Sequence, residues 1–289
     1  MPAREWSEDA AARRSIKPFM GAFTRHGHTA PMSEVRDDAP PLLAADASWA
    51  LFLDFDGTLV ELAETPDAVR VDRGLPARLQ SLAGALQGAL ALVSGRPLAT
   101  LDAMLEPLQV PAAGLHGVER RGADGEVFRF EPDQRVLDEA RRVLARFVVA
   151  HPQALLEDKH ASLALHYRRD PSLQPLARKA AEDALAHTRE GFHIQSGHMV
   201  YEIKSTAADK GAALHAFLDE EPFAGRTPVF IGDDDTDEHG FTVVAAQGGF
   251  GVRVGNGDGA TAARYRLRDP AAVHAWLRGS LDSLGGGRA

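Results

Sequence analysis

The sequence has no cysteine, no long apolar run and no excess of positive charge. The absence of cysteine excludes disulfide bonds and zinc sites built on thiolate ligands. The longest apolar candidate, residues 86–93, is much shorter than a membrane span and contains Gln87 and Gly88. Acidic residues outnumber basic ones, 41 against 32, which gives a formal net charge of −9. This balance argues against non-specific binding of nucleic acid, which needs a basic face.

The N-terminal part has no clear pattern. Residues 1–36 mix charged residues, alanine, glycine and histidine without periodicity and lack the apolar segment of a signal peptide. We therefore expect a cytoplasmic protein in which residues 1–47 form a disordered extension. Whether Met32 is the natural start stays open. The length of 289 residues, with 44% hydrophobic and 25% charged residues, is typical of a globular protein with one large or two modest domains.

From Trp49 onward, buried apolar strands alternate with helices. Such continuous apolar strands predict a parallel sheet covered by helices on both faces. The first half of this pattern comprises strands at 50–54, 89–94 and 112–115, with helices at 75–86 and from Pro97, a proline expected in the first turn. The second half comprises helices at 209–218, 242–246 and 271–281 and strands at 228–232, 252–254 and 265–267.

A different pattern interrupts these two halves after Glu119. It comprises a strand at 127–130, an amphipathic helix at 132–151, a hairpin of 155–158 and 162–167, a helix at 175–187, and strands at 192–195 and 199–203. Alternation of apolar and polar residues in the hairpin predicts an antiparallel sheet with one free face. We therefore predict an α/β fold, with a doubly wound parallel-sheet core at 48–119 and 205–282 and an inserted α+β cap at 120–204.

The most informative motif is the apolar run 51–53 followed by Asp54, Phe55, Asp56 and Gly57. Parallel α/β sheets bind ligands at the carboxyl ends of their strands. Two carboxylates there, beside backbone amides, suit a hard cation such as Mg²⁺, and the first can also act as a nucleophile. The motif therefore indicates phosphoryl chemistry.

Three further motifs also fall at strand ends or helix starts: Ser94-Gly95-Arg96, Lys210, and the acidic cluster Asp233, Asp234 and Asp237. A hydroxyl and amides at a strand-to-helix turn can hold phosphate, and a lysine can neutralise it. Each motif alone also has a structural interpretation as a turn, a solvated lysine or a helix cap. Their occurrence together, in this order, favours function.

These four motifs, in this order, resemble the haloacid dehalogenase superfamily of aspartate-based phosphotransferases. An insert between the second and third resembles the larger, C2-type cap of that superfamily. The resemblance implies that Asp54 attacks phosphorus to form an aspartyl-phosphate, and that Asp56 protonates the leaving alcohol and then activates water. It implies that Ser94 and Lys210 hold phosphoryl oxygens.

The resemblance also implies a Mg²⁺ cofactor. Its ligands would be Asp54, the backbone carbonyl of Asp56, and Asp233. Asp234 and Asp237 would occupy supporting positions. Phosphoryl transfer needs in-line positioning and neutralised oxygen charge, which a metal and a lysine supply.

Four segments narrow the resemblance to the trehalose-6-phosphate phosphatase family: GLHGVE at 114–119, LEDK at 156–159, ALHYR at 164–168 and VYEIK at 200–204. The likeness runs from about residue 49 to 281, and departs where Ser205 replaces a frequent proline. It implies that the cap binds glucose hydroxyls. It also implies that His116 and Glu119 lie near the core–cap junction. The residues implied to bind substrate are Asp54, Phe55, Asp56, Ser94, Gly95, Arg96, His116 and Glu119 in the core, and Glu157, Lys159 and Glu202 in the cap. Without the resemblance, Glu157 and Lys159 would be interpreted as a surface ion pair.

The leading hypothesis is Mg²⁺-dependent hydrolysis of trehalose 6-phosphate to trehalose and phosphate, in trehalose biosynthesis, with Asp54, Asp56 and Lys210 as catalytic residues. One alternative is another capped phosphatase that acts on sucrose phosphate or a mannosyl phosphate. Another is a non-catalytic sugar-phosphate sensor, or a phospho-accepting receiver, although neither needs both Asp54 and Asp56. We expect a monomer with no nucleic-acid or membrane partner. Association with a trehalose-phosphate synthase stays open.

Overall fold

The computed structural model describes residues 39–63, 68–159, 161–186, 191–197, 199–206, 208–256 and 259–285. The predictions for residues 1–38, including Met32, lie outside the described residues. Among the described helices, none has both the length and the apolar character that crossing a membrane requires.

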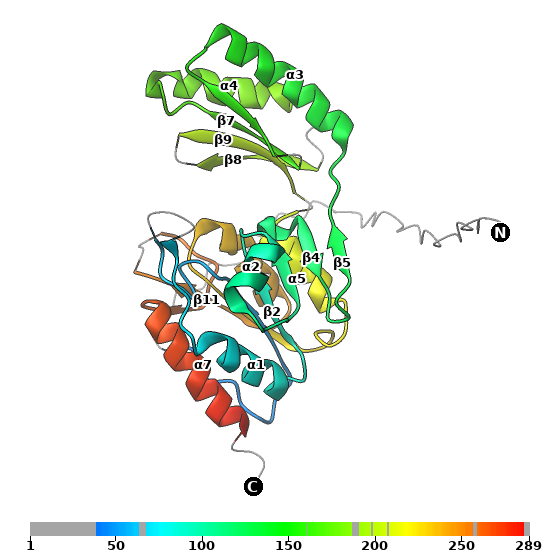
Figure 1. Ribbon diagram of the computed structural model, residues 1–289, viewed down its shortest axis with the longest axis vertical. Helices are drawn as coiled ribbons and strands as arrows, with labels where there is room; N and C mark the ends of the chain where they lie inside the picture. The colour runs from blue at the N-terminus through cyan, green and yellow to red at the C-terminus, as the bar shows by residue number, and fades with distance from the viewer. Residues whose placement is uncertain are drawn as a thin grey trace, which may run out of the picture. The chain divides into compact units, whose positions relative to one another are not determined.

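An eight-stranded sheet forms the first part of the fold (Figure 1). Its strand order is β12-β11-β10-β1-β2-β3-β4-β5. Its strands are β1 (Trp49–Leu53), β2 (Leu90–Val93), β3 (Ala112–Gly114), β4 (Glu119–Arg121), β5 (Val127–Arg129), β10 (Thr227–Gly232), β11 (Phe250–Val254) and β12 (Tyr265–Leu267). The strands from β12 to β3 are parallel. Strands β1, β2 and β10 are almost entirely buried. Their continuous apolar sequences are those expected of central parallel strands, which are covered on both faces.

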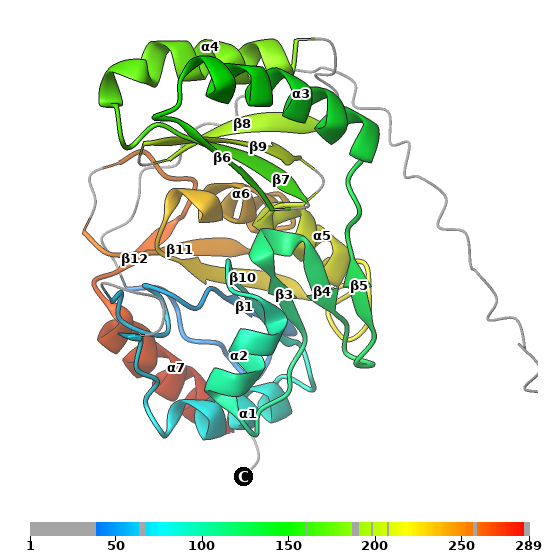
Figure 2. The same ribbon diagram turned by 45° about the horizontal axis from the view of Figure 1, so that its top comes forward.

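Helices cover both faces of this sheet (Figure 2). They are α1 (Leu75–Ala85), α2 (Leu98–Leu105), α5 (Lys210–Leu218), α6 (Glu238–Ala246) and α7 (Pro270–Gly285). α1 packs with α7 on one face, and α5 packs with α6 on the other. The predicted doubly wound α/β fold is therefore confirmed.

A second, antiparallel sheet has the order β6-β7-β9-β8 and its own hydrophobic cluster. Its elements are α3 (Gln134–Ala150), β6 (Leu155–Asp158), β7 (Ser162–His166), α4 (Gln174–Ala184), β8 (Phe192–Gly197) and β9 (Val200–Ser205). α3 and α4 cover one face of the sheet (Figure 1) and bury the alternate residues Leu163, Leu165 and Ile203. Only four residues then separate the end of β9 at Ser205 from the start of α5 at Lys210.

Two details differ from the sequence-based predictions. The strand predicted at 127–130 was grouped with the inserted module, whereas β4 and β5 pair antiparallel as an extension of the first sheet. All three residues of β5 are exposed, so no apolar pattern identifies the sheet to which it belongs. Pro97 is the residue before α2 rather than a residue of its first turn.

The segment just before β1 is also different, since residues 39–47 were expected to be part of a disordered extension. Leu43 is fully buried, and its N–H donates to Ser280 Oγ at 3.3 Å. Trp276 Nε1 donates to the carbonyl oxygens of Pro40 and Pro41 at 3.2 and 3.1 Å. This short stretch therefore packs along α7, and the two prolines, with φ fixed near an extended value, present carbonyls to the indole.

Candidate active site

Acidic and hydroxyl side chains follow three neighbouring strands of the eight-stranded sheet. Strands β10, β1 and β2 are adjacent and parallel, so their carboxyl ends lie along one edge. Asp233 follows β10, Asp54 follows β1, and Ser94 follows β2. The structure thus brings three of the predicted site residues to the edge at which parallel sheets bind ligands.

Lys210 connects α5 to this edge. Asp209 caps the helix, because its Oδ1 accepts a hydrogen bond from Ala212 N at 2.8 Å. Lys210 Nζ donates to Asp54 Oδ1 at 2.9 Å and to Asp237 Oδ1 at 2.8 Å. Burial alone would lower the pKa of Lys210, but attraction to these carboxylates outweighs burial and raises it. The site therefore holds a permanent, buried positive charge.

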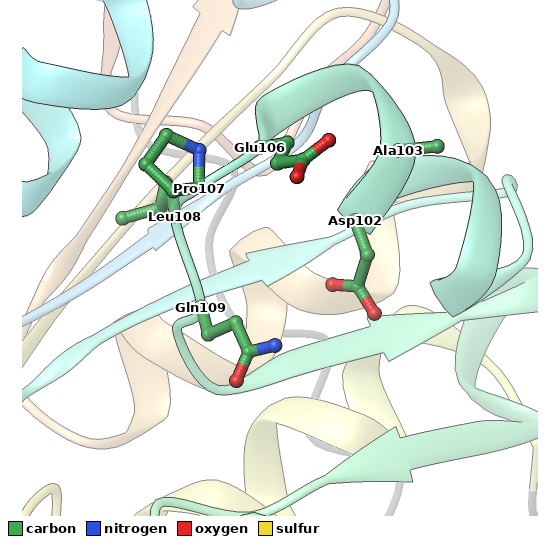
Figure 3. A pocket seen from close by; sticks show the side chains of 6 residues that line it. All are labelled: Asp102, Ala103, Glu106, Pro107, Leu108 and Gln109. Carbon is green, nitrogen blue, oxygen red and sulfur yellow. The ribbon is translucent and has the colours of Figure 1, made fainter.

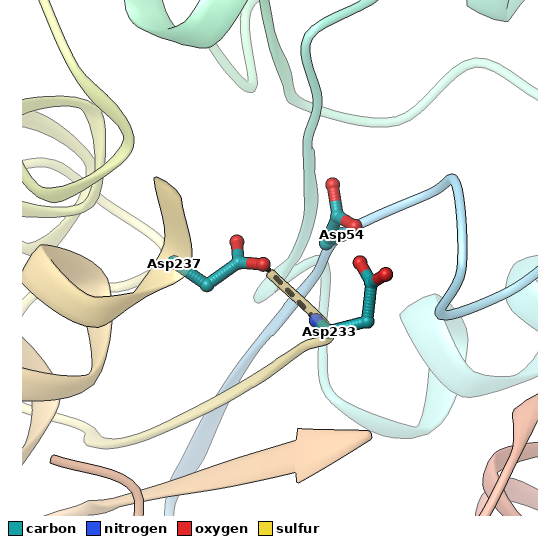
Figure 4. A group of neighbouring side chains, drawn as sticks. All are labelled: Asp54, Asp233 and Asp237. Atoms are coloured by element: carbon teal, nitrogen blue, oxygen red, sulfur yellow. Dashed lines mark hydrogen bonds between the residues drawn. The ribbon is translucent and has the colours of Figure 1, made fainter. Parts of the chain in front are cut away.

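Three carboxylates lie close together next to this lysine. Asp54, Asp233 and Asp237 each place an oxygen within 4.8 Å of the others. Figure 4 shows these three side chains. Burial raises the pKa of Asp54 to about 7 despite the attraction of Lys210. Burial and neighbouring carboxylates raise the pKa of Asp233 to about 6 and that of Asp237 to about 8. A divalent cation relieves such crowding, and oxygen donors alone are the set that Mg²⁺ prefers. The donor set therefore fits the predicted metal.

Gly57 makes room for this cluster. Its φ of +73° lies in the left-handed region, and a Cβ on it would lie 2.0 Å from Asp233 Oδ2. A side chain at this position would therefore strain the turn after β1 and displace the Asp233 carboxylate.

Asp237 and Asp234 organise the loop after β10. Asp237 Oδ2 accepts hydrogen bonds from the backbone N–H of Asp233 at 3.0 Å, the dashed line in Figure 4, and of Asp234 at 3.1 Å. Asp234 Oδ1 accepts from Thr236 N at 2.9 Å and from Thr236 Oγ1 at 2.6 Å. Both side chains thus hold the backbone that carries Asp233.

Asp56 lies next to the turn after β2. Arg96 Nε and Nη2 donate to its two carboxylate oxygens, each at 2.7 Å. Ser94 is fully buried, and its Oγ accepts a hydrogen bond from Arg96 N at 3.1 Å. Asp56, Gly95 and Arg96 line a cavity of about 470 Å³. The Phe55 side chain belongs to the hydrophobic core, so only its backbone can reach a ligand.

His116 also contacts this turn. Its backbone has a φ of +56°, uncommon for a non-glycine residue, and its N–H donates to Ser94 O at 2.9 Å. Its ring lies against Gly95, where a Cβ would approach the ring to 2.7 Å. Burial and the charge of Lys210 lower the pKa of His116 to about 4, so the imidazole is neutral at pH 7.

Glu119, which the resemblance implied as a substrate-binding residue, makes a structural contact. It is buried, and its Oε1 accepts a hydrogen bond from Leu98 N at 2.6 Å, at the start of α2. Its other oxygen lies 3.7 Å from Arg129 Nε. The structure therefore shows Glu119 capping a helix rather than lining the described cavities.

The expected sugar-binding residues lie in the second sheet or, for Lys159, directly after its strand β6. Glu157 and Glu202 are in register across β6, β7 and β9, with Ala164 between them. Glu202 Oε1 accepts from Ser162 Oγ at 2.5 Å and lies 3.4 Å from Lys159 Nζ, whereas Glu157 pairs with His166 at 2.8 Å. Burial opposes ionisation of Glu202, but the contacts with Ser162 and Lys159 outweigh it and lower its pKa. Glu202 also lines a small cavity of about 70 Å³ together with His116.

A larger cavity, of about 320 Å³, is not indicated by any of the sequence motifs. It is lined by residues of the four-stranded sheet and by residues of the helices and loops on the eight-stranded sheet. Its polar lining residues include Lys210 and His239 together with His193, Gln195 and Lys204 of β8 and β9. Gln195 pairs with Glu202 in the sheet register, and His193 pairs with Lys204. Alternation along β8 could have placed His193 and Gln195 on the same face as Glu202, but nothing in the sequence locates His239 beside them.

One further hollow, of about 400 Å³, lies at the end of α2 (Figure 3). Its lining residues are Asp102, Ala103, Glu106, Pro107, Leu108 and Gln109, and none of them is a predicted site residue. It therefore plays no part in the site described above.

Comparison with known proteins agrees with this arrangement. The sequence model of the family described as trehalose-phosphatase matches residues 52–271. A probable trehalose-phosphate phosphatase of Sinorhizobium fredii is 46% identical over 208 residues, which cover 72% of this chain and 78% of that protein. The trehalose-6-phosphate phosphatase of Escherichia coli (strain K12) is 40% identical over 246 residues, which cover 85% and 90%.

Solved structures show a similar fold. A structure of Aspergillus fumigatus trehalose-6-phosphate phosphatase, crystal form 3, matches with a TM-score of 0.70 and 25% identity, over 82% of this chain and 94% of that one. The family match spans most of the chain, and both bacterial relatives are similar over more than two thirds of it. The chain therefore belongs to the trehalose-phosphatase family.

Proposed function

We propose that this protein hydrolyses trehalose 6-phosphate to trehalose and inorganic phosphate, with Mg²⁺ as cofactor. The names of the bacterial relatives support this substrate. The observation that carries the chemistry is the buried contact of Lys210 with Asp54 and Asp237, next to Asp233. A nucleophile, a fixed cation and a carboxylate cluster thereby meet where a phosphoryl group can be held and neutralised.

In the proposed first step, an Asp54 carboxylate oxygen attacks phosphorus. The bond from phosphorus to the sugar oxygen breaks, and Asp56 donates its proton to that oxygen. In the second step, Asp56 takes a proton from water, the water oxygen attacks the aspartyl-phosphate, and phosphate leaves with Asp54 restored. Because Asp56 is held by Arg96 in the structure, we infer that this ion pair opens or turns during turnover.

The remaining residues hold the phosphoryl group in line. Lys210 and the turn of Ser94 and Gly95 would bind its oxygens. Asp54, the Asp56 carbonyl and Asp233 would hold Mg²⁺, with Asp237 and Asp234 fixing the loop behind Asp233. The metal, when bound, supplies charge neutralisation and keeps Asp54 ionised.

We also propose that the eight-stranded sheet with its helices is a catalytic core and the four-stranded sheet is a cap that binds the sugar. The strand contacts support a cap that begins after β5 rather than at residue 120. Glu157, Lys159 and Glu202, on the cap, would bind sugar hydroxyls far from phosphorus. The protein would thus use sugar binding to align the phosphate.

The test is phosphate release from a panel of sugar phosphates, with Mg²⁺ and with a chelator. Fastest hydrolysis of trehalose 6-phosphate, dependent on Mg²⁺, is expected. Preference for sucrose phosphate or a mannosyl phosphate would replace this substrate while retaining the chemistry. Binding without turnover would identify a sensor. A cytoplasmic monomer, and association with a synthase, stay predictions.

A further inference from the structure

We propose that His193 and His239 bind hydroxyl groups of the sugar and set selectivity for sugar phosphates. Both residues line the 320 Å³ cavity, each from a different sheet or its covering helices. The inference rests on the proposed function and extends it to two residues outside the motifs. His193 belongs to β8, in the four-stranded sheet, and His239 to α6, on the eight-stranded sheet.

His193 has a ring nitrogen without a partner in the described part of the protein. Its Nδ1 is buried and has no hydrogen-bond partner among the described residues, so a ligand in the cavity reaches it when the ring turns. A buried polar atom left without a partner costs about 1–3 kcal/mol, so the site favours a ligand that supplies one. Burial and the charge of Lys204 lower the pKa of His193. The neutral ring has one donor and one acceptor nitrogen, and a sugar hydroxyl can pair with either.

His239 is held in one orientation. Its Nδ1 donates to both carboxylate oxygens of Asp209, at 2.9 and 2.8 Å. The ring also lies over Gly211, where a Cβ would approach it to 2.5 Å. Because Asp209 occupies Nδ1, Nε2 is the nitrogen left for the cavity, and the side chain is 51% exposed. A carboxylate that orients an imidazole through Nδ1 and leaves Nε2 for a ligand is a common way to preorganise a histidine.

The position of Lys210 relates both histidines to the phosphate. Lys210 lines the same cavity and contacts Asp54, so one wall adjoins the phosphoryl site. The volume of about 320 Å³ lies near the lower end of the range for ligand sites, about 300–1,000 Å³. Its polar lining, including Gln195 and Lys204, suits a polyhydroxylated ring rather than an aryl group.

The experiment compares four variants with the unmodified enzyme: His193→Ala, His193→Asn, His239→Ala and the control His215→Ala. His215 is an exposed residue of α5 that lines none of the described cavities. kcat/KM is measured with Mg²⁺ for trehalose 6-phosphate and for p-nitrophenyl phosphate, which has no sugar hydroxyl. Thermal unfolding of each variant verifies folding. Inhibition by trehalose and by inorganic phosphate is measured as a binding readout.

Each alanine variant should lose about 5- to 50-fold in kcat/KM for trehalose 6-phosphate, the effect expected of one lost hydrogen bond. This loss should exceed the loss for the aryl phosphate by at least about 5-fold. Asn places an amide near the position of Nδ1, so His193→Asn should recover part of the loss. Inhibition by trehalose should weaken while inhibition by phosphate is retained.

Equal losses for both substrates, or losses no larger than that of His215→Ala, would overturn the proposal. These outcomes leave the proposed function intact if the unmodified enzyme still prefers trehalose 6-phosphate. If the unmodified enzyme prefers another sugar phosphate, the proposed substrate fails. The same ratio measured with that sugar phosphate then decides on the two histidines.

Discussion

Replacing Lys210 with methionine should destabilise the protein in a pH-dependent way. The substitution keeps the volume of the side chain but removes the cation between Asp54 and Asp237, whose side chains are 4% and 0% exposed. Removing one partner of a buried ion pair costs about 3–5 kcal/mol in unfolding free energy. The exposed pair of Lys179 and Asp183 gives a matched control, because Lys179→Met should cost less than about 1 kcal/mol.

The sign of the pH dependence follows from the carboxyl groups. The pKa values of Asp54 and Asp237 are raised to about 7 and about 8 from 3.8, and loss of Lys210 raises them further. The folded variant then binds protons that the unfolded chain releases, so its unfolding free energy falls as pH rises from 3.8 toward the raised pKa values. Urea unfolding without divalent metal should show a loss at about pH 8.5 that exceeds the loss at about pH 5.5 by at least about 1 kcal/mol, because the loss grows between the pKa values of the unmodified protein and the higher ones of the variant. A loss independent of pH would refute the idea that unpaired buried carboxylates cause it.

The other predictions concern catalysis. Asp54→Asn should abolish phosphate release while the protein still unfolds cooperatively, and near-normal turnover would contradict its role as nucleophile. Asp56→Asn should lower kcat by about 10²- to 10⁴-fold, the usual contribution of acid–base help, as measured by single-turnover kinetics. Exhaustive chelation should stop hydrolysis, and Mg²⁺ should restore it. Ca²⁺ should restore it poorly, because the looser coordination shell of Ca²⁺ misplaces the phosphoryl group. Activity that survives chelation would exclude a metal at Asp233. Glu202→Ala should lower kcat/KM for trehalose 6-phosphate by about 10- to 10³-fold, and an equal loss with an aryl phosphate would make Glu202 structural.

The central sheet could be predicted from the sequence because burial on both faces requires continuous apolar strands. Strand β1 (Trp49–Leu53) and strand β10 (Thr227–Gly232) are examples, and both lie near their predicted bounds. Strand β5 had no such requirement, because its three residues are exposed, so its sheet could not be identified. The packing of Leu43 on α7 depends on a partner more than 200 residues away, and local patterns do not reveal it.

The acidic part of the site could be located for a similar reason. Asp54 and Asp233 directly follow buried strands, so the order of the strands in the sheet predicts their proximity. Glu119 and His239 depend on tertiary contacts instead. The sequence does not show that Glu119 caps α2 or that Asp209 orients His239. The roles assigned to these residues stay predictions until the variants are measured.

The short connection between β9 and α5 limits how far recognition and chemistry can be exchanged as separate modules. Glu202, proposed to bind sugar, and Lys210, proposed to bind phosphate, lie on one continuous stretch of chain with four residues between strand and helix. A cap grafted from a phosphatase of different sugar preference therefore has its last strand joined almost directly to the lysine of the recipient. Such a chimera should keep its turnover only if the graft preserves the length and the Asp209 cap of this junction, so new specificity is more easily obtained by point changes on β8 than by replacing the whole insert.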